Sequence, residues 1–76
     1  MIRLHLGCGR SRLNGWINCD LFPGDNVDRV FDVQQGGWPF PDNSVNEIYA
    51  SHLLEHLTDF ETFFAEAWRV MKPLSG

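Results

Sequence analysis

Two glycines on either side of a cysteine are the first residues of the sequence that could bind a ligand. Gly7, Cys8 and Gly9 follow the run 2–6, in which apolar and polar residues alternate as in a short strand. Glycines at a strand end permit positive φ angles and let backbone N–H groups approach an anionic or carboxylate group closely. The pattern therefore predicts either a ligand-binding loop or a plain turn.

An acidic residue ends the second apolar run. Asp20 closes the segment 16–20. At the carboxyl end of a parallel strand, a carboxylate can accept hydrogen bonds from both ribose hydroxyls of a nucleoside, whereas an isolated aspartate there is simply solvated. The full dinucleotide pattern would need a third glycine where Arg12 stands, which disfavours a nicotinamide or flavin enzyme.

A third run could bind a metal. His52, Glu55 and His56 match the HxxEH pattern of inverted zinc proteases, in which two histidines bind zinc and the glutamate polarises water. A zinc site needs a further ligand, however, and so short a pattern recurs by chance. We therefore expect no stoichiometric zinc and keep a zinc hydrolase as a third hypothesis, with histidines at the start of a helix as the simpler interpretation.

Four short apolar runs predict the strands that would position these residues. They cover 2–6, 16–20, 27–33 and 45–51. The segment 34–44 contains two adjacent glycines and two prolines, which exclude both helix and sheet. Because Trp38 and Phe40 lie within that segment, we expect it to fold back onto the core.

The last segment predicts a helix that ends at Pro73. Thr58 precedes Glu61 by three residues, which is the spacing of a capping box. Strands followed by an amphipathic helix predict an α/β layer structure. One apolar stripe is expected to pack on the sheet and the polar residues to face solvent. The stripe is Phe60, Phe63, Phe64, Ala67, Trp68 and Met71, and the polar residues are Glu61, Thr62, Glu66 and Arg69.

These segments resemble, in order, the motifs of class I S-adenosylmethionine-dependent methyltransferases, and most closely the small type 11 methyltransferase domains. The resemblance covers nearly the whole chain, and several ordered motifs are far more specific than any one. It implies an α/β, truncated Rossmann-like fold of about four short, mainly parallel strands with a C-terminal amphipathic helix. It also implies a single partial domain over 1–76 that ends before the fifth strand. The motifs are LHLGCG (4–9), WINCD (16–20), WPFPDNS (38–44), EIYASHLLEHL (47–57) and EAWRVMKP (66–73).

The resemblance also implies a cofactor, S-adenosylmethionine, and the residues that would bind it. Methyl transfer is a displacement at an already activated carbon, so the protein mainly supplies orientation and exclusion of water, and no metal is required. His52 is the candidate general base for acceptors that need one. By position, Leu6, Gly7, Cys8 and Gly9 would surround the methionine part, Asp20 would hold the ribose, Leu21 would flank the adenine, Asp32 and Val33 would meet its amino edge, and Ser51 with His52 would lie beside the sulfonium.

The sequence departs from the family pattern in several places. His5 stands where an acid is frequent, and Ser11 stands where a third glycine is common. The connections 10–15 and 21–26 are too short for a crossover helix. Six extended residues still span about 20 Å, which is enough to run back along a short strand. The turn residues 23–26 alone favour a hairpin, but the resemblance favours a parallel arrangement.

Composition restricts the partners of the chain. With 76 residues it can hold one small core, and its net charge of −4, without any basic run, argues against nucleic acid as a partner. No apolar run is long enough to span a bilayer. Cys8 and Cys19 form no CxxC pair, so we expect two reduced thiols and a cytoplasmic location.

The acceptor is not defined by these motifs, and we expect an unidentified small-molecule or glycan-like compound. The alternative function is a non-catalytic module that binds the cofactor or associates with itself. An apolar edge strand over 45–51 and the aromatic helix stripe would then support a homodimer.

Overall fold

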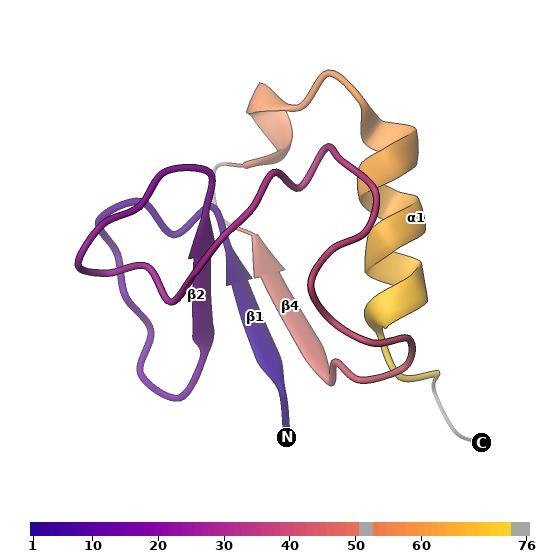
Figure 1. Ribbon diagram of the computed structural model, residues 1–76, viewed down its shortest axis with the longest axis horizontal. Coiled ribbons are helices and arrows are strands. Elements are labelled where there is room, and N and C mark those ends of the chain that lie inside the picture. Colours follow the sequence, from indigo (N-terminus) through magenta and orange to yellow (C-terminus); the bar gives the residue numbers. More distant parts are fainter. Residues whose placement is uncertain (51–52, 74–76) are drawn as a thin grey trace.

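A computed structural model describes residues 1–50 and 53–73 of the chain. The described elements follow one another in the order that the sequence predicts, with the strands first and the main helix last (Figure 1). This confirms the α/β class. The elements are β1 (Arg3–Leu6), β2 (Ile17–Asp20), β3 (Arg29–Val30), β4 (Glu47–Ala50), the short 3₁₀ helix η1 (Leu54–His56) and α1 (Phe60–Val70).

The four strands form one sheet in the order β3-β2-β1-β4, and every neighbouring pair is parallel. Leu4 is in register with Ile17 on β2 and with Ile48 on β4. The hairpin that residues 23–26 favour by themselves does not form. Strand order 3-2-1-4 is the beginning of the doubly wound α/β arrangement, in which ligands bind outside the carboxyl ends of the strands where the order reverses. That reversal lies between β1 and β4.

The observed strands are shorter than the predicted ones, by one residue for β1 and β2 and by more for β3 and β4. The third was expected over 27–33, but β3 itself has two residues, because Asp32 and Val33 leave the sheet for a turn. Pairing extends slightly beyond it, since the Phe31 N–H donates to the Asp20 carbonyl at 3.1 Å. The fourth was expected over 45–51. Val45 instead forms an isolated bridge with Met71, and Ser51 lies outside the described residues.

One face of the sheet is covered by α1 together with the segment 31–40. Leu4 and Leu6 are fully buried there, and they belong to the same cluster as Phe63. Trp38 and Phe40 belong to it as well, and only 3% and 7% of their surface is exposed. This confirms that the glycine- and proline-rich segment folds back onto the core.

The opposite face is covered by the connection between β1 and β2. His5 and Asn18 point to this face and are buried. The Leu13 N–H donates to Asn18 Oδ1 at 3.0 Å, and His5 Nδ1 lies 2.9 Å from the same oxygen. Because Oδ1 accepts both bonds, the His5 Nδ1 carries the proton. The His5 ring also lies 5.3 Å from the ring of Tyr49. A short connection thus buries polar side chains where a crossover helix would otherwise lie.

The apolar stripe of α1 does not pack as a whole against the sheet, which corrects the sequence prediction. Phe63 and Val70 are buried, but Phe60 and Phe64 are 48% and 55% exposed. Trp68 is 85% exposed. The helix therefore faces the core through an arc centred on Phe63 and Val70, and it presents a stripe of three aromatic rings to solvent.

Glu66 gives the physical reason for this rotation. Its Oε1 accepts hydrogen bonds from the Gly37 N–H at 2.9 Å and from the Trp38 N–H at 2.8 Å. Glu66 and Arg69 were expected on the solvent face, but their side chains are only 13% and 30% exposed. Satisfying these backbone donors turns Glu66 inward, and the aromatic side chains turn outward as a result.

Arg69 completes this contact. Its guanidinium donates to the Trp38 carbonyl and to the Phe40 carbonyl, both at 3.0 Å, and to Asp42 Oδ1 at 2.7 Å. It also lies 2.9 Å from Glu66 Oε1. We call Glu66 and Arg69 the helix clamp, because together they hold the segment 37–42 on α1.

The helix begins one residue later than the expected capping box. Asp59 is the N-cap, and its Oδ1 accepts a hydrogen bond from the Thr62 N–H at 3.0 Å. Thr58 instead donates both its N–H and its hydroxyl to Gln34 Oε1. Both residues are good N-cap types, and a contact distant in sequence decides between them.

The edge of the sheet at β4 is covered at its beginning. The chain that leaves α1 runs parallel to Val45, and the Lys72 N–H donates to the Val45 carbonyl at 2.8 Å. Val45 is therefore fully buried. The open edge expected over 45–51 is restricted in the described chain to the part beyond Val45.

We expect the charge of Glu66 to stabilise the fold. The hydrogen bond from Arg69 holds the pKa of this carboxyl below its usual range. Its stabilising effect is therefore complete above about pH 4.3, the ordinary pKa of glutamate, and is lost as the pH falls through the lower folded value. Glu66→Gln should lower the free energy of unfolding at pH 7 by about 1.5–3 kcal/mol, the range for hydrogen bonds to charged groups.

Urea unfolding at pH 7 and at pH 3 measures this effect. The difference between the original chain and Glu66→Gln should shrink at the lower pH. Glu61→Gln, on an exposed position of the same helix, is the matched control and should change little. Equal effects of the two substitutions would contradict the role of the helix clamp.

Candidate functional site

The carboxyl ends of β1 and β2 border a hollow of about 170 Å³, which we call the strand-end hollow. It lies beside the reversal in strand order, where the fold predicts ligand binding. One wall comes from the strand ends and the other from the segment around η1. The first wall is Gly7, Asp20, Leu21, Phe31, Asp32, Val33 and Gln34, and the second is Leu53, His56 and Leu57.

Gly7 and Gly9 adopt the backbone conformation that the sequence predicts. Their φ angles are +68° and +55°, in the left-handed region that favours glycine. A Cβ atom at Gly7 would also lie 3.2 Å from Leu53 Cδ1, whereas one at Gly9 would meet nothing within 4 Å. Gly7 is therefore needed for both its conformation and its close contact with Leu53, and Gly9 for its conformation.

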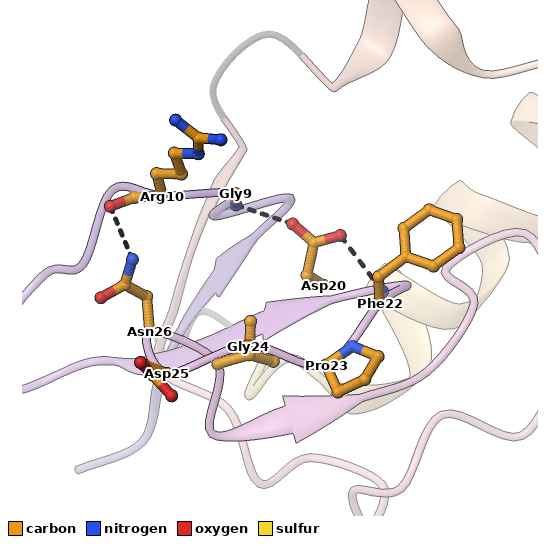
Figure 2. A pocket seen from close by; sticks show the side chains of 9 residues that line it. Gly9, Arg10, Asp20, Phe22, Pro23, Gly24, Asp25 and Asn26 are labelled. Carbon is orange, nitrogen blue, oxygen red and sulfur yellow. Dashed lines mark hydrogen bonds between the residues drawn. The ribbon is translucent and has the colours of Figure 1, made fainter.

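Asp20 joins the end of β2 to the glycine loop. Its Oδ2 accepts a hydrogen bond from the Gly9 N–H at 2.7 Å, and its Oδ1 accepts one from the Leu21 N–H at 2.7 Å (Figure 2 shows the first). A carboxylate has about four lone-pair sites. Asp20 is thus held in place by two short bonds and keeps acceptor capacity for the hydroxyls of a ligand.

Asp32 and Val33 reach the same hollow from a turn that follows β3. Asp32 Oδ1 accepts from the Gln34 N–H at 2.8 Å, and the Asp32 carbonyl accepts from the Gln35 N–H at 3.1 Å. The Val33 carbonyl accepts from Trp38 Nε1 at 3.1 Å. These bonds fix the turn, so an apolar side chain and a carboxylate border the same hollow as Leu21.

A second hollow, of about 510 Å³, also borders Asp20 (Figure 2). It is bordered by Gly9, Arg10 and the segment 22–27. Asn26 Nδ2 donates to the Arg10 carbonyl at 2.9 Å and ties the two loops together. It is larger than the strand-end hollow, but it contains only Gly9 and Asp20 of the residues assigned to the cofactor.

Leu6 and Cys8 lie in the interior rather than in either hollow. Leu6 is fully buried and Cys8 is 4% exposed. Burial is the main cause that raises the pKa of the Cys8 and Cys19 thiols, and the pKa of Cys19 rises to about 12. Both cysteines are free. Because the pKa of each thiol is raised, both stay protonated at neutral pH and act as small apolar groups. Leu6 and Cys8 can contribute to a ligand only through their backbone.

Ser51 and His52 lie outside the described residues, so their predicted roles remain predictions. His56 is exposed, and its Nε2 lies 3.7 Å from Glu55 Oε1. Among residues 1–50 and 53–73, no three His, Cys, Asp or Glu side chains form a group that could hold a metal ion. The zinc hypothesis depends on His52 and stays untested.

Sequence reasoning missed five residues of the strand-end hollow: Phe31, Gln34, Leu53, His56 and Leu57. Two of them carried a usable signal, because Leu53 and Leu57 are four residues apart and present one apolar face. Gln34 carried none, since its role comes from contacts more than twenty residues away in sequence.

A comparison with protein-family models matches residues 4–75 to the family described as methyltransferase domain. The chain belongs to this family. A comparison with curated proteins gave no match. Members of the family generally bind S-adenosylmethionine. In this methyltransferase domain, five residues that the resemblance assigned to the cofactor border one hollow: Gly7, Asp20, Leu21, Asp32 and Val33.

The methyltransferase domain has a Rossmann-like sheet in which none of the three connections between the four strands contains a helix. The described part of the chain contains no helix that is both long and apolar enough to cross a membrane. The carboxyl end of the sheet is ordered nonetheless, because the Asp20 carboxylate bonds to Gly9 and Leu21 and the Asp32 carboxylate holds the turn after β3.

We expect the two glycines of the loop to differ in their tolerance of substitution. Gly7→Ala forces a Cβ into the left-handed region and against Leu53, whereas Gly9→Ala meets only the backbone strain. Left-handed strain costs about 1–2 kcal/mol per residue. Gly9→Ala should therefore lower the free energy of unfolding by about that amount, and Gly7→Ala by more.

Urea unfolding of the two variants tests this order. Gly36→Ala is the control, because a Cβ there meets nothing and its φ is not in the left-handed region. If Gly7→Ala were as well tolerated as Gly36→Ala, Leu53 would not pack on the glycine loop as described.

Proposed function

We propose that this methyltransferase domain binds S-adenosylmethionine in the strand-end hollow and forms the cofactor-binding part of an enzyme that methylates a small-molecule or glycan-like acceptor. One observation carries the proposal. Asp20, which ends β2 and is bonded to Gly9, borders the same hollow as Gly7, Asp32 and Val33. A ribose acceptor, an apolar flank and a carboxylate for an amino group thus meet at the reversal of strand order.

Each of these residues has a defined task toward the cofactor. Asp20 has acceptor sites left for the ribose hydroxyls. Leu21 and Val33 offer apolar surfaces to the faces of the adenine, and Asp32 offers a carboxylate oxygen to its amino group. Gly7 has no side chain, so the cofactor can approach the backbone at the end of β1.

The cofactor supplies a methyl group on an activated sulfonium. The chain then needs to orient the reacting groups and exclude water. Leu57 is buried and Leu53 is half-buried, and together they give the second wall of the hollow an apolar surface. His52 remains our candidate base for acceptors that lose a proton. We propose the cytoplasm as the compartment, because both cysteines are unpaired.

Calorimetric titration with S-adenosylhomocysteine tests cofactor binding. Asp20→Ala should weaken binding by about 1.5–3 kcal/mol, the value of hydrogen bonds to a charged group. Asp25→Ala removes the same charge from an exposed position on the neighbouring hollow and is the matched control, with binding expected to stay unchanged. A folded chain that gives no heat at millimolar ligand would end the proposal.

The aromatic stripe of α1 supports a second function, self-association. Phe60, Phe64 and Trp68 are spaced by four residues and exposed, and the first two rings stack at 6.4 Å. Glu61 lies at the acidic start of the helix and Lys72 follows its end. Two copies packed antiparallel would bury the stripe and bring each acidic start near the other's basic end. We propose this face, rather than the β4 edge alone, as the dimer interface.

Light scattering coupled to size-exclusion chromatography measures the assembly. We expect a dimer, and we expect Trp68→Glu to give a monomer, because a charge replaces the most exposed ring of the stripe. Phe22→Glu is the control, since Phe22 is 70% exposed on a loop away from α1. A strictly monomeric chain at high concentration would exclude this second function.

A further inference from the structure

We propose that Gln34 is a positioning residue that fixes the separation of the two walls of the strand-end hollow and thereby controls cofactor affinity. This inference rests on the proposed function. The two walls come from segments far apart in sequence, the turn at 32–35 and the segment 53–57. The Gln34 side chain ties the turn to the residues that directly follow the second segment, because its Oε1 accepts from the Thr58 N–H at 2.6 Å, the Thr58 hydroxyl at 3.1 Å and the Asp59 N–H at 2.8 Å.

On the sheet side, Gln34 is coupled to the carboxylate expected to bind the adenine. Its N–H donates to Asp32 Oδ1 at 2.8 Å. Any shift of the Gln34 backbone therefore moves or releases the Asp32 side chain. Gln34 itself borders the hollow, next to Val33.

On the helix side, Gln34 holds the residues that connect η1 to α1. Asp59 is the N-cap of α1, and Thr58 directly follows the buried Leu57. Backbone N–H groups at the start of a helix lack partners within the helix, so an acceptor brought from elsewhere satisfies them. The amide oxygen of Gln34 does this for Thr58 and Asp59, and it thereby fixes where Leu57 lies relative to Val33.

The helix clamp keeps this effect local. Glu66 bonds to Gly37 and Trp38, and Arg69 bonds to Trp38 and Phe40, so the same loop stays attached to α1 when Gln34 is changed. Loss of the Gln34 side chain should therefore loosen the hollow more than it loosens the fold. These three bonds use only the amide oxygen of Gln34, so a glutamate can accept all of them, and helix N-termini favour negative charge.

Three variants separate the role of Gln34 from general destabilisation. Gln34→Ala should bind S-adenosylhomocysteine about tenfold more weakly in calorimetric titration, which corresponds to about 1.4 kcal/mol. Gln34→Glu should restore binding of S-adenosylhomocysteine to within about twofold of the original chain. Gln35→Ala removes the side chain of the exposed neighbouring glutamine and is the matched control.

Hydrogen exchange of the free chain supplies a second measurement. The amides of Thr58 and Asp59 should lose protection in Gln34→Ala and keep it in Gln34→Glu, while the amides of β1 stay protected in both. Binding that Gln34→Ala leaves unchanged would overturn the role of Gln34, and so would failure of Gln34→Glu to restore it. Absence of binding by the original chain, with Thr58 and Asp59 protected, would instead overturn the proposed function on which this role depends.

Discussion

The contact between the helix clamp and the segment 37–42 is the interaction on which the rest of the structure depends. This segment covers the core but pairs with no strand, so its backbone groups need partners from elsewhere. A buried polar group without a partner costs about 1–3 kcal/mol. Glu66 and Arg69 supply those partners, which allows Trp38 and Phe40 to be buried. Because this contact also sets the rotation of α1, it determines which aromatic rings reach solvent.

The candidate site is held by few secondary-structure elements. Without crossover helices beside β1 and β2, the ends of these strands are held by short backbone and carboxylate bonds. Asp20 bonds to Gly9 and Leu21, and Asp32 bonds to Gln34. These bonds lie within the loops and hold in place the residues that line the hollow. The methyltransferase domain therefore has an ordered candidate site at the strand ends with little supporting structure around it.

The sequence predicted features that local sterics or ordered motifs decide, such as the positive φ angles of Gly7 and Gly9. The motifs, rather than the turn residues, indicated the parallel sheet. Periodicity marked the helix but could not tell which arc would face the sheet, because the inward turn of Glu66 depends on a distant loop. The position of the N-cap likewise depended on Gln34, whose contacts with Thr58 no local pattern contains.

The short connections also affect how the sheet can assemble. Leu4 pairs with Ile17 across a separation of 13 residues and with Ile48 across 44. Loop-closure entropy grows with the logarithm of this separation, so the first pairing costs about 1 kcal/mol less chain entropy than the second. Parallel strands usually require a long crossover and fold slowly for that reason. Here the short connection lowers that cost for β1 and β2, so chain entropy favours their pairing over the pairing of β1 with β4.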